Sequence, residues 1–206
     1  MILPPTKKGK KYEIRALGLR DFAGLRRDDE RLDPFELARY AGLLVATFDQ
    51  IEPFLSEETK NHLLGNGKDK WSGGASSQRL PDGRKLIILN PTHGRNRQNA
   101  TLMEEISHVF LGHTPSRLSI PKRNKKGQLI ARDYRPEIEE EAYSVGAAAL
   151  TPYSALARFV SEGRTSRQIA RHFNVSRELV EFRIKVCLLW DEYKRYNEKW
   201  DSAEGR

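Results

Sequence analysis

The sequence predicts a mainly helical α+β fold that includes a small β-sheet. Apolar residues recur at the three- and four-residue spacing of amphipathic helices in several separate stretches. One stretch, 85–90, is a short β-rich apolar run that follows a Pro-Asp-Gly turn. A further stretch, 99–113, is an expected helix that carries two adjacent carboxylates and an imidazole near its middle. The first two observations predict the fold class, and the third indicates where the chemistry lies.

The composition predicts a soluble, basic protein. Its 206 residues suffice for one sizeable core or for a domain with a small appendage. The net charge of +8 favours anionic partners such as nucleic acid or acidic protein segments, and it equally fits a basic protein with no such partner. Cys187 is the single cysteine, which excludes an intrachain disulfide. Because no apolar run has the length of a signal-peptide core or a membrane span, we expect a cytoplasmic protein without a membrane partner.

The N-terminal part divides into an arm and two helices. Residues 1–30 are rich in proline and lysine and weakly periodic, so we expect a basic arm or a peripheral helix. Asp33 can cap a helix over 33–45 whose first position is Pro34, where a missing N–H costs nothing. A second short helix is expected at 56–64, with Ser56 as its N-cap.

A β-hairpin follows these helices. Residues 76–80 are expected to be extended, 81–83 to form the turn, and 85–90 to form the second strand with 86–89 buried. A polar loop over 92–98 then leads into the helix at 99–113.

The C-terminal part begins with a basic, apolar-poor segment at 116–136. We expect a solvated loop or hairpin around Lys126 and Gly127, with an electrostatic docking surface as the other account. Residues 137–150 then predict a helix that starts with consecutive glutamates and contains small residues that allow a close helix neighbour.

A helix-turn-helix pattern follows from residue 161. Thr165 and Gln168 fit a capping box, and 174–176 fits a turn whose serine caps the next helix. That helix has an apolar stripe formed by Val180, Ile184 and Leu188, and a further helix continues to about residue 200.

The helix at 99–113 suggests a metal site. Glu104 and His108 are four residues apart and therefore share one helix face, and Glu105 lies one step round. In the HExxH arrangement two histidines at this spacing bind zinc, and the intervening glutamate is the general base. Here glutamate occupies the first ligand position. His108 and Glu104 are thus ligand candidates, Glu105 is the base, and a third ligand is expected from the acidic start of the 137–150 helix.

Ordinary structural roles also account for these residues. Thr101 and Glu104 themselves fit a capping box, in which Glu104 would only satisfy the helix N-terminus. Glu105 would then be a solvated carboxylate, and His108 a hydrogen-bonded core histidine.

Five segments match a known family pattern in the same order along the chain. They are 86–91 (LIILNP), 97–103 (RQNATLM), 104–113 (EEISHVFLGH), Glu139 with Ala142 and 150–152 (LTP), and 169–176 (IARHFNVS) with Arg183. Over 32–190 the chain thereby resembles the ImmA/IrrE family of metallopeptidases.

The resemblance implies a zincin-like, gluzincin-type fold and a zinc-dependent endopeptidase that cleaves a repressor protein to relieve transcriptional repression. It implies His108 and Glu139 as metal ligands and Glu105 as the catalytic base, and it places Glu104 where the family has histidine. The corresponding domains are an arm or helix at 1–30, a metallopeptidase domain at 31–160 and a helix-turn-helix-like region at 161–206.

Glutamate at position 104 leaves three alternatives. Glu104 ligates, giving a site with one histidine and two glutamates that acidifies water less and accepts Mn²⁺ or Fe²⁺ more readily than a histidine-rich site. Alternatively, His113 or His93 replaces it; His113 would require the helix to end first, and it is also a candidate transition-state stabiliser. In the third alternative the protein is an inactive pseudopeptidase that only binds partners.

DNA binding is the main rival function. Basic residues in the helix-turn-helix segment would face a DNA groove; they are Arg164, Arg167, Arg171, Arg177, Arg183 and Lys185. The same segment also fits a helical part of a peptidase scaffold, and we favour the peptidase.

Overall fold

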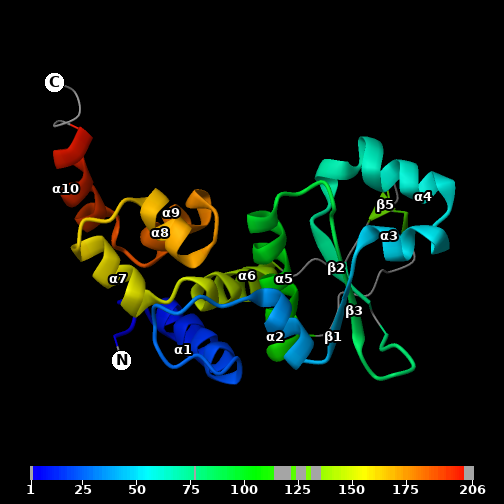
Figure 1. The fold of residues 1–206 in the computed structure, drawn as a ribbon, viewed down its shortest axis with the longest axis horizontal. Helices are drawn as coiled ribbons and strands as arrows, with labels where there is room; N and C mark the ends of the chain where they lie inside the picture. The colour runs from blue at the N-terminus through cyan, green and yellow to red at the C-terminus, as the bar shows by residue number, and fades with distance from the viewer. Residues whose placement is uncertain (1, 77, 114–121, 124–128, 131–135, 202–206) are drawn as a thin grey trace.

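Helices form most of the molecule, and a three-stranded sheet lies at one end (Figure 1). This computed structural model describes residues 2–76, 78–113, 122–123, 129–130 and 136–201. Its α-helices are α1 (Lys7–Phe22), α2 (Pro34–Tyr40), α3 (Phe48–Ile51), α4 (Glu57–Asn61), α5 (Arg95–Phe110), α6 (Pro136–Leu150), α7 (Tyr153–Ser161), α8 (Ser166–Phe173), α9 (Arg177–Val186) and α10 (Trp190–Asp201). Short turns of other helix types are η1 (Glu52–Phe54), η2 (His62–Asn66) and η3 (Lys68–Lys70). The mainly helical α+β prediction is confirmed.

The sheet has the strand order β1 (Leu43–Ala46), β3 (Lys85–Leu89), β2 (Gly73–Ala75). β1 runs parallel to β3, and β2 runs antiparallel to it, with Gly73 opposite Leu89. The predicted hairpin exists, but its first strand lies at 73–75 instead of 76–80. The Ser76 N–H still donates to the Leu86 carbonyl, but the Leu86 N–H donates to the Ser76 hydroxyl, so a side chain takes the place of one backbone acceptor there.

The helix expected over 33–45 ends five residues early. Asp33 caps it and Pro34 is its first residue, as predicted. Gly42 then adopts a φ of +65°, which ends the helix, and the following residues form β1. The prediction was wrong there because a short apolar run does not distinguish helix from strand by its period.

Helix α1 replaces the expected arm, and it is not peripheral. It lies along α6 (Figure 1), and Ala16 and Leu19 belong to the hydrophobic core. Its inward face also carries two charged residues, Glu13 and Arg20, which are buried. Apolar periodicity does not reveal this helix, because charged residues at inward positions are taken as solvent-facing.

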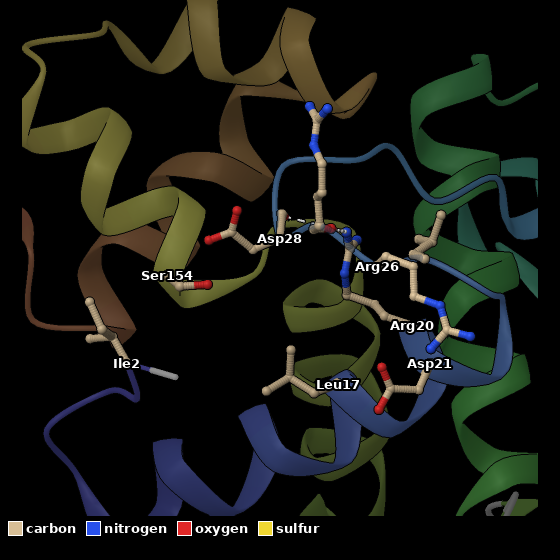
Figure 2. A pocket seen from close by; sticks show the side chains of 9 residues that line it. Ile2, Leu17, Arg20, Asp21, Arg26, Asp28 and Ser154 are labelled. Carbon is tan, nitrogen blue, oxygen red and sulfur yellow. Dashed lines mark hydrogen bonds between the residues drawn. The ribbon is translucent and has the colours of Figure 1, made fainter.

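Arg20 shows how such a charge is accommodated. Its guanidinium donates to the carbonyl oxygens of Ala149, Arg27 and Glu30 at 2.8–2.9 Å. Figure 2 shows the side chain reaching from α1 toward the segment that carries Arg26 and Asp28. A buried cation is tolerated when its donors are paired with acceptors such as these carbonyl oxygens.

The C-terminal helices follow the predicted caps. Thr165 and Gln168 form a capping box at α8, and Ser176 caps α9. Val180 and Ile184 are fully buried, whereas Leu188 lies beyond the end of α9 with a φ of +58° and is 65% exposed. The stripe prediction was therefore wrong at Leu188, and the buried Leu189 takes the inward place.

A single core cluster includes residues from α1 through Leu189. In the basic segment, β4 (Lys122–Arg123) and β5 (Leu129–Ile130) pair antiparallel, while the expected turn at Lys126 and Gly127 lies outside the described residues. No helix in the described part of the chain has the length and apolar character needed to cross a membrane.

Candidate metal centre

Helix α5 places the predicted ligand and base residues at the boundary between the core and the solvent. Leu102, Met103 and Ile106 are fully buried on one side, while Glu104, Glu105 and His108 are half-buried. The helix starts at Arg95 after Gly94, so Thr101 lies in its second turn and is buried. The capping-box account of Thr101 and Glu104 was therefore wrong.

The close approach of α6 brings the third acidic residue to α5. A side chain at Gly146 would place its Cβ 3.1 Å from the carbonyl carbon and oxygen of Met103, so any larger residue would have to push the Met103 backbone away by a few tenths of an ångström. Glu139 lies seven residues earlier on the same face of α6. Because the helices cross in opposite directions here, Glu139 meets His108, five residues after Met103.

Three potential ligand atoms converge at this crossing. One atom each from Glu104, His108 and Glu139 lies within 4.8 Å of the other two. His108 Nε2 is 3.4 Å from Glu139 Oε2. Tetrahedral ligands about 2.1 Å from zinc lie about 3.4 Å apart, so small side-chain movements would let all three bind one ion.

The electrostatics of this cluster favour a cation. Burial, and then the charges of Glu105 and Glu139, raise the pKa of Glu104 to about 7. Three neighbouring carboxylates repel one another when ionised, and a divalent cation relieves that repulsion. The donor set of one imidazole and two carboxylates therefore fits zinc or a harder divalent metal.

Tyr143 is a neighbour that the sequence interpretation missed. It lies one turn after Glu139 on α6, and burial followed by the charge of Glu104 raises the pKa of its phenol. Its four-residue spacing from Glu139 was a signal, but only the helix pairing shows which partner that face meets.

The other two histidines considered as ligands, His113 and His93, lie at different distances from His108. His113 lies against His108, with the two Nδ1 atoms 3.1 Å apart, and its Nε2 is 3.4 Å from Glu141 Oε2. Its two nitrogens thus contact His108 and Glu141. His93 precedes α5 and lies about 20 Å from His108 along the helix, so it cannot replace a ligand there.

Glu141 connects this cluster to α1. Its Oε1 pairs with Lys11 Nζ at 2.9 Å and also with Arg15 Nη1. Burial opposes ionisation of Glu141, but the hydrogen bond from Lys11, the charge of Arg15 and the contact with His113 outweigh it and hold its pKa below the usual value. The sequence interpretation assigned Glu141 only to an acidic helix face.

Two pockets lie away from the cluster. One, of about 420 Å³, borders α1 and is lined by residues including Ile2, Leu17 and Ser154 (Figure 2). The other, of about 400 Å³, is lined by residues including Lys68, His93 and Arg97. Neither is lined by Glu104, His108 or Glu139, so the converging ligand atoms, not the size of a hollow, locate the candidate site.

Comparison with known families assigns the chain. The model of the M78 peptidase family, described as the IrrE N-terminal-like domain, matches residues 66–185, more than half of the chain. This protein belongs to that family. The match includes α5, α6 and most of the C-terminal helices, and the ImmA/IrrE resemblance expected from the sequence is confirmed.

A solved structure, a Mycobacterium tuberculosis transcriptional regulator, resembles this M78 family member with a TM-score of 0.51 and 15% sequence identity. The alignment covers 84% of this chain and 46% of the regulator, so the chain spans less than half of that protein's length. At this identity the likeness supports the fold alone. No curated protein sequence matches the chain significantly.

Proposed function

We propose that this protein is a zinc-dependent metallo-endopeptidase of the ImmA/IrrE type that cleaves a regulatory, repressor-like protein. The observation that carries the proposal is the convergence of Glu104, His108 and Glu139 from two helices onto one point. Membership of the M78 family supports a peptidase, and the raised pKa of Glu104 supports a cation at the centre.

His108 would hold zinc through Nε2, and Glu104 and Glu139 through carboxylate oxygens. Zinc bound there would lower the pKa of water and polarise the substrate carbonyl. The two carboxylate ligands also make Mn²⁺ or Fe²⁺ alternative occupants.

Glu105 is the proposed general base. It precedes His108 by three residues, and its charge contributes to the raised pKa of Glu104, so its carboxylate lies near that of Glu104. Its carboxylate would accept a proton from water and deliver it to the nitrogen of the departing amine.

Strand β2 is the proposed binding edge for an extended substrate segment. It is an outer strand of the sheet, and a Cβ at Gly73 would lie 2.7 Å from Thr101 Cγ2, one helical turn before Glu104. A peptide that adds to this edge would thus run past the ligand cluster. The net charge of +8 favours an acidic segment in the substrate.

Metal content tests the central claim. Protein purified without chelators should carry about one zinc per chain by elemental mass spectrometry, and Glu104→Ala should lose it. Glu137→Ala, an exposed position on α6, is the matched control and should retain zinc. Zinc retained by Glu104→Ala would remove Glu104 from the ligand set, and absence of metal after incubation with zinc would exclude a metallopeptidase.

The alternative function is a pseudopeptidase that regulates a partner by binding. Glutamate in place of the family's histidine at position 104 favours it. Binding of a repressor without cleavage, by wild-type protein and Glu105→Gln alike, would support this alternative over the peptidase.

DNA binding through the C-terminal helices is less well supported by the geometry. Arg183 is buried against Glu13 at 2.8 Å, and Arg177 pairs with Glu181. A salt-dependent retardation of DNA would support this function, and no retardation at low salt would exclude it.

A further inference from the structure

A backbone motif at the end of α5 returns His113 to the side of His108. After the last helical residue, Phe110, Gly112 adopts a φ of +67°. The His113 N–H donates to the His108 carbonyl at 2.9 Å, and the Gly112 N–H donates to the Val109 carbonyl at 3.2 Å. This pair of bonds is a Schellman motif, which requires the left-handed conformation that glycine adopts readily.

The side chains of His108 and His113 are also in contact. The Nδ1 atoms of His108 and His113 are 3.1 Å apart, and the rings meet edge to face with centroids 5.1 Å apart. His113 Nε2 then lies 3.4 Å from Glu141 Oε2, and the other Glu141 oxygen is paired with Lys11 and Arg15. The side chains of His113 and Glu141 are only 10% and 16% exposed.

With a cation on His108 Nε2 and both rings neutral, one arrangement of protons satisfies the contacts from His108 through His113 to Glu141. His108 Nε2 needs a lone pair to bind a cation, so its proton resides on Nδ1. That N–H donates to the lone pair on His113 Nδ1, and His113 in turn donates its Nε2–H to Glu141. Glu141 accepts from His113 on one oxygen and from Lys11 and Arg15 on the other.

We propose that His113 and Glu141 are positioning residues that hold His108 with Nε2 directed at Glu104 and Glu139, and that α1 completes this support through Lys11 and Arg15. The inference rests on the proposed cation site. It gives His113 a role outside the ligand set, and it makes the N-terminal helix part of the metal centre's surroundings. Partners of this kind fix the tautomer and ring orientation of metal-binding histidines.

The first test asks which nitrogen of His108 binds the metal. In zinc-bound protein, long-range ¹H–¹⁵N correlation spectra at a pH about two units above the usual imidazole pKa of about 6.5 report the tautomer of each of the five histidines. His108 should bind zinc through Nε2 and carry its proton on Nδ1. His113→Phe, which keeps the ring but removes both nitrogens, should let part of the His108 population bind zinc through Nδ1, with the proton on Nε2.

The second test measures metal directly. His113→Phe should weaken zinc affinity about 10- to 100-fold in a chelator competition and alter the visible spectrum of the Co²⁺ protein. His113→Asn, whose side-chain oxygen can accept from His108 Nδ1–H, should recover part of the affinity. Glu141→Gln should weaken binding, whereas Glu140→Gln should not, because Glu140 pairs with Lys8 on α1 but contacts neither histidine.

The outcomes separate the two proposals. Wild-type protein that binds neither Zn²⁺ nor Co²⁺ overturns the metallopeptidase and this positioning role with it. Wild-type binding together with an unchanged tautomer and zinc affinity within twofold in His113→Phe and His113→Asn overturns the positioning role alone. Should His113→Phe fail to fold, His113→Asn and Glu141→Gln decide the question.

Discussion

Glu104 is the residue at which proton and metal compete. Its carboxylate is half-buried, and burial with the charges of Glu105 and Glu139 raises its pKa from 4.5 to about 7. Below pH 7 the metal-free protein therefore holds a proton there, which must leave before the oxygen can bind a cation. We expect metal affinity to rise with pH through about 7 for this reason.

The same shift makes a prediction about stability. Because the folded-state pKa lies above the unfolded value, the protonated carboxyl stabilises the fold fully below about pH 4.5, and this contribution is lost as the pH rises through about 7. The free energy of unfolding should fall by about 3 kcal/mol over this pH range. Glu104→Gln, which stays neutral, should lack this loss and be more stable than the wild type above pH 7. Urea unfolding with chelator present, between pH 4.5 and 8.5, measures it.

Glu137→Gln, at an exposed position, is the control for that series and should follow the wild type. Parallel pH profiles for wild type and Glu104→Gln would contradict the raised pKa. With saturating zinc the order should reverse, because only the wild type retains the full ligand set.

A substitution at Glu105 should separate the effect on catalysis from the effect on metal binding. Glu105→Gln keeps the size of the side chain but removes its basicity, so we expect cleavage to fall about 10²- to 10⁴-fold with zinc content unchanged. Cleavage of a repressor substrate and elemental analysis of the same preparation measure the two quantities. Cleavage at the wild-type rate would mean that another group takes the proton.

At the scale of elements, the site depends on how closely α5 and α6 approach. Gly146 allows this approach because a Cβ at this position would lie only 3.1 Å from the Met103 backbone. Gly146→Leu should force the helices apart, destabilise the protein by about 1–3 kcal/mol and weaken zinc binding because Glu139 moves away from His108. Chemical unfolding and chelator competition measure both effects.

Glu137→Leu tests whether a bulky apolar residue anywhere on α6 has the same effect. Its position is exposed, so stability and zinc affinity should stay close to wild type. Equal zinc affinity in Gly146→Leu and the control would show that helix separation does not set the ligand geometry.

Local signals predicted the element ends that depend on neighbouring residues. Asp33, Ser56, Thr165 and Ser176 cap helices as expected, because a cap bonds within three residues of itself. Strand β1 was missed since it is defined by its parallel partner β3, some forty residues away in sequence.

The candidate site was also predicted only in part from the sequence. The pair Glu104 and His108 follows from helical spacing, and family resemblance supplied Glu139. Tyr143 and the contact between His113 and Glu141 were missed because they depend on the pairing of two helices and on the turn after α5.

At the scale of the whole molecule, a buried ion pair joins the two ends of the chain. Glu13 in α1 and Arg183 in α9 are 170 residues apart in sequence and 2.8 Å apart in space, with side chains 1% and 5% exposed. Glu13 also accepts from the Tyr153 N–H at 2.6 Å, and Arg183 donates to the Thr151 carbonyl. The pair therefore fixes α1 and α9 to the junction between α6 and α7.

This connection predicts one cooperative unit instead of a separable arm, peptidase domain and C-terminal region. Arg183→Met should destabilise the protein by about 3–5 kcal/mol, because it leaves Glu13 buried without its cation. Arg177→Met, in the exposed pair of the same helix, should cost far less, because solvent screens that pair. Glu13→Leu combined with Arg183→Met should recover part of the loss, limited by the unpaired Tyr153 N–H and Thr151 carbonyl.

Urea unfolding followed by both circular dichroism and tryptophan fluorescence measures these changes. Trp71 reports on the sheet end and Trp190 on the C-terminal helices, so coincident transitions in wild type and Arg183→Met would indicate a single unit. A C-terminal transition that separates from the rest would show that α9 and α10 fold independently of α1. Zinc binding should be followed in the same titration. If zinc is lost together with that transition, the support that α1 gives to Glu141 depends on the buried pair. If zinc binding persists beyond the transition, that support is independent of the pair.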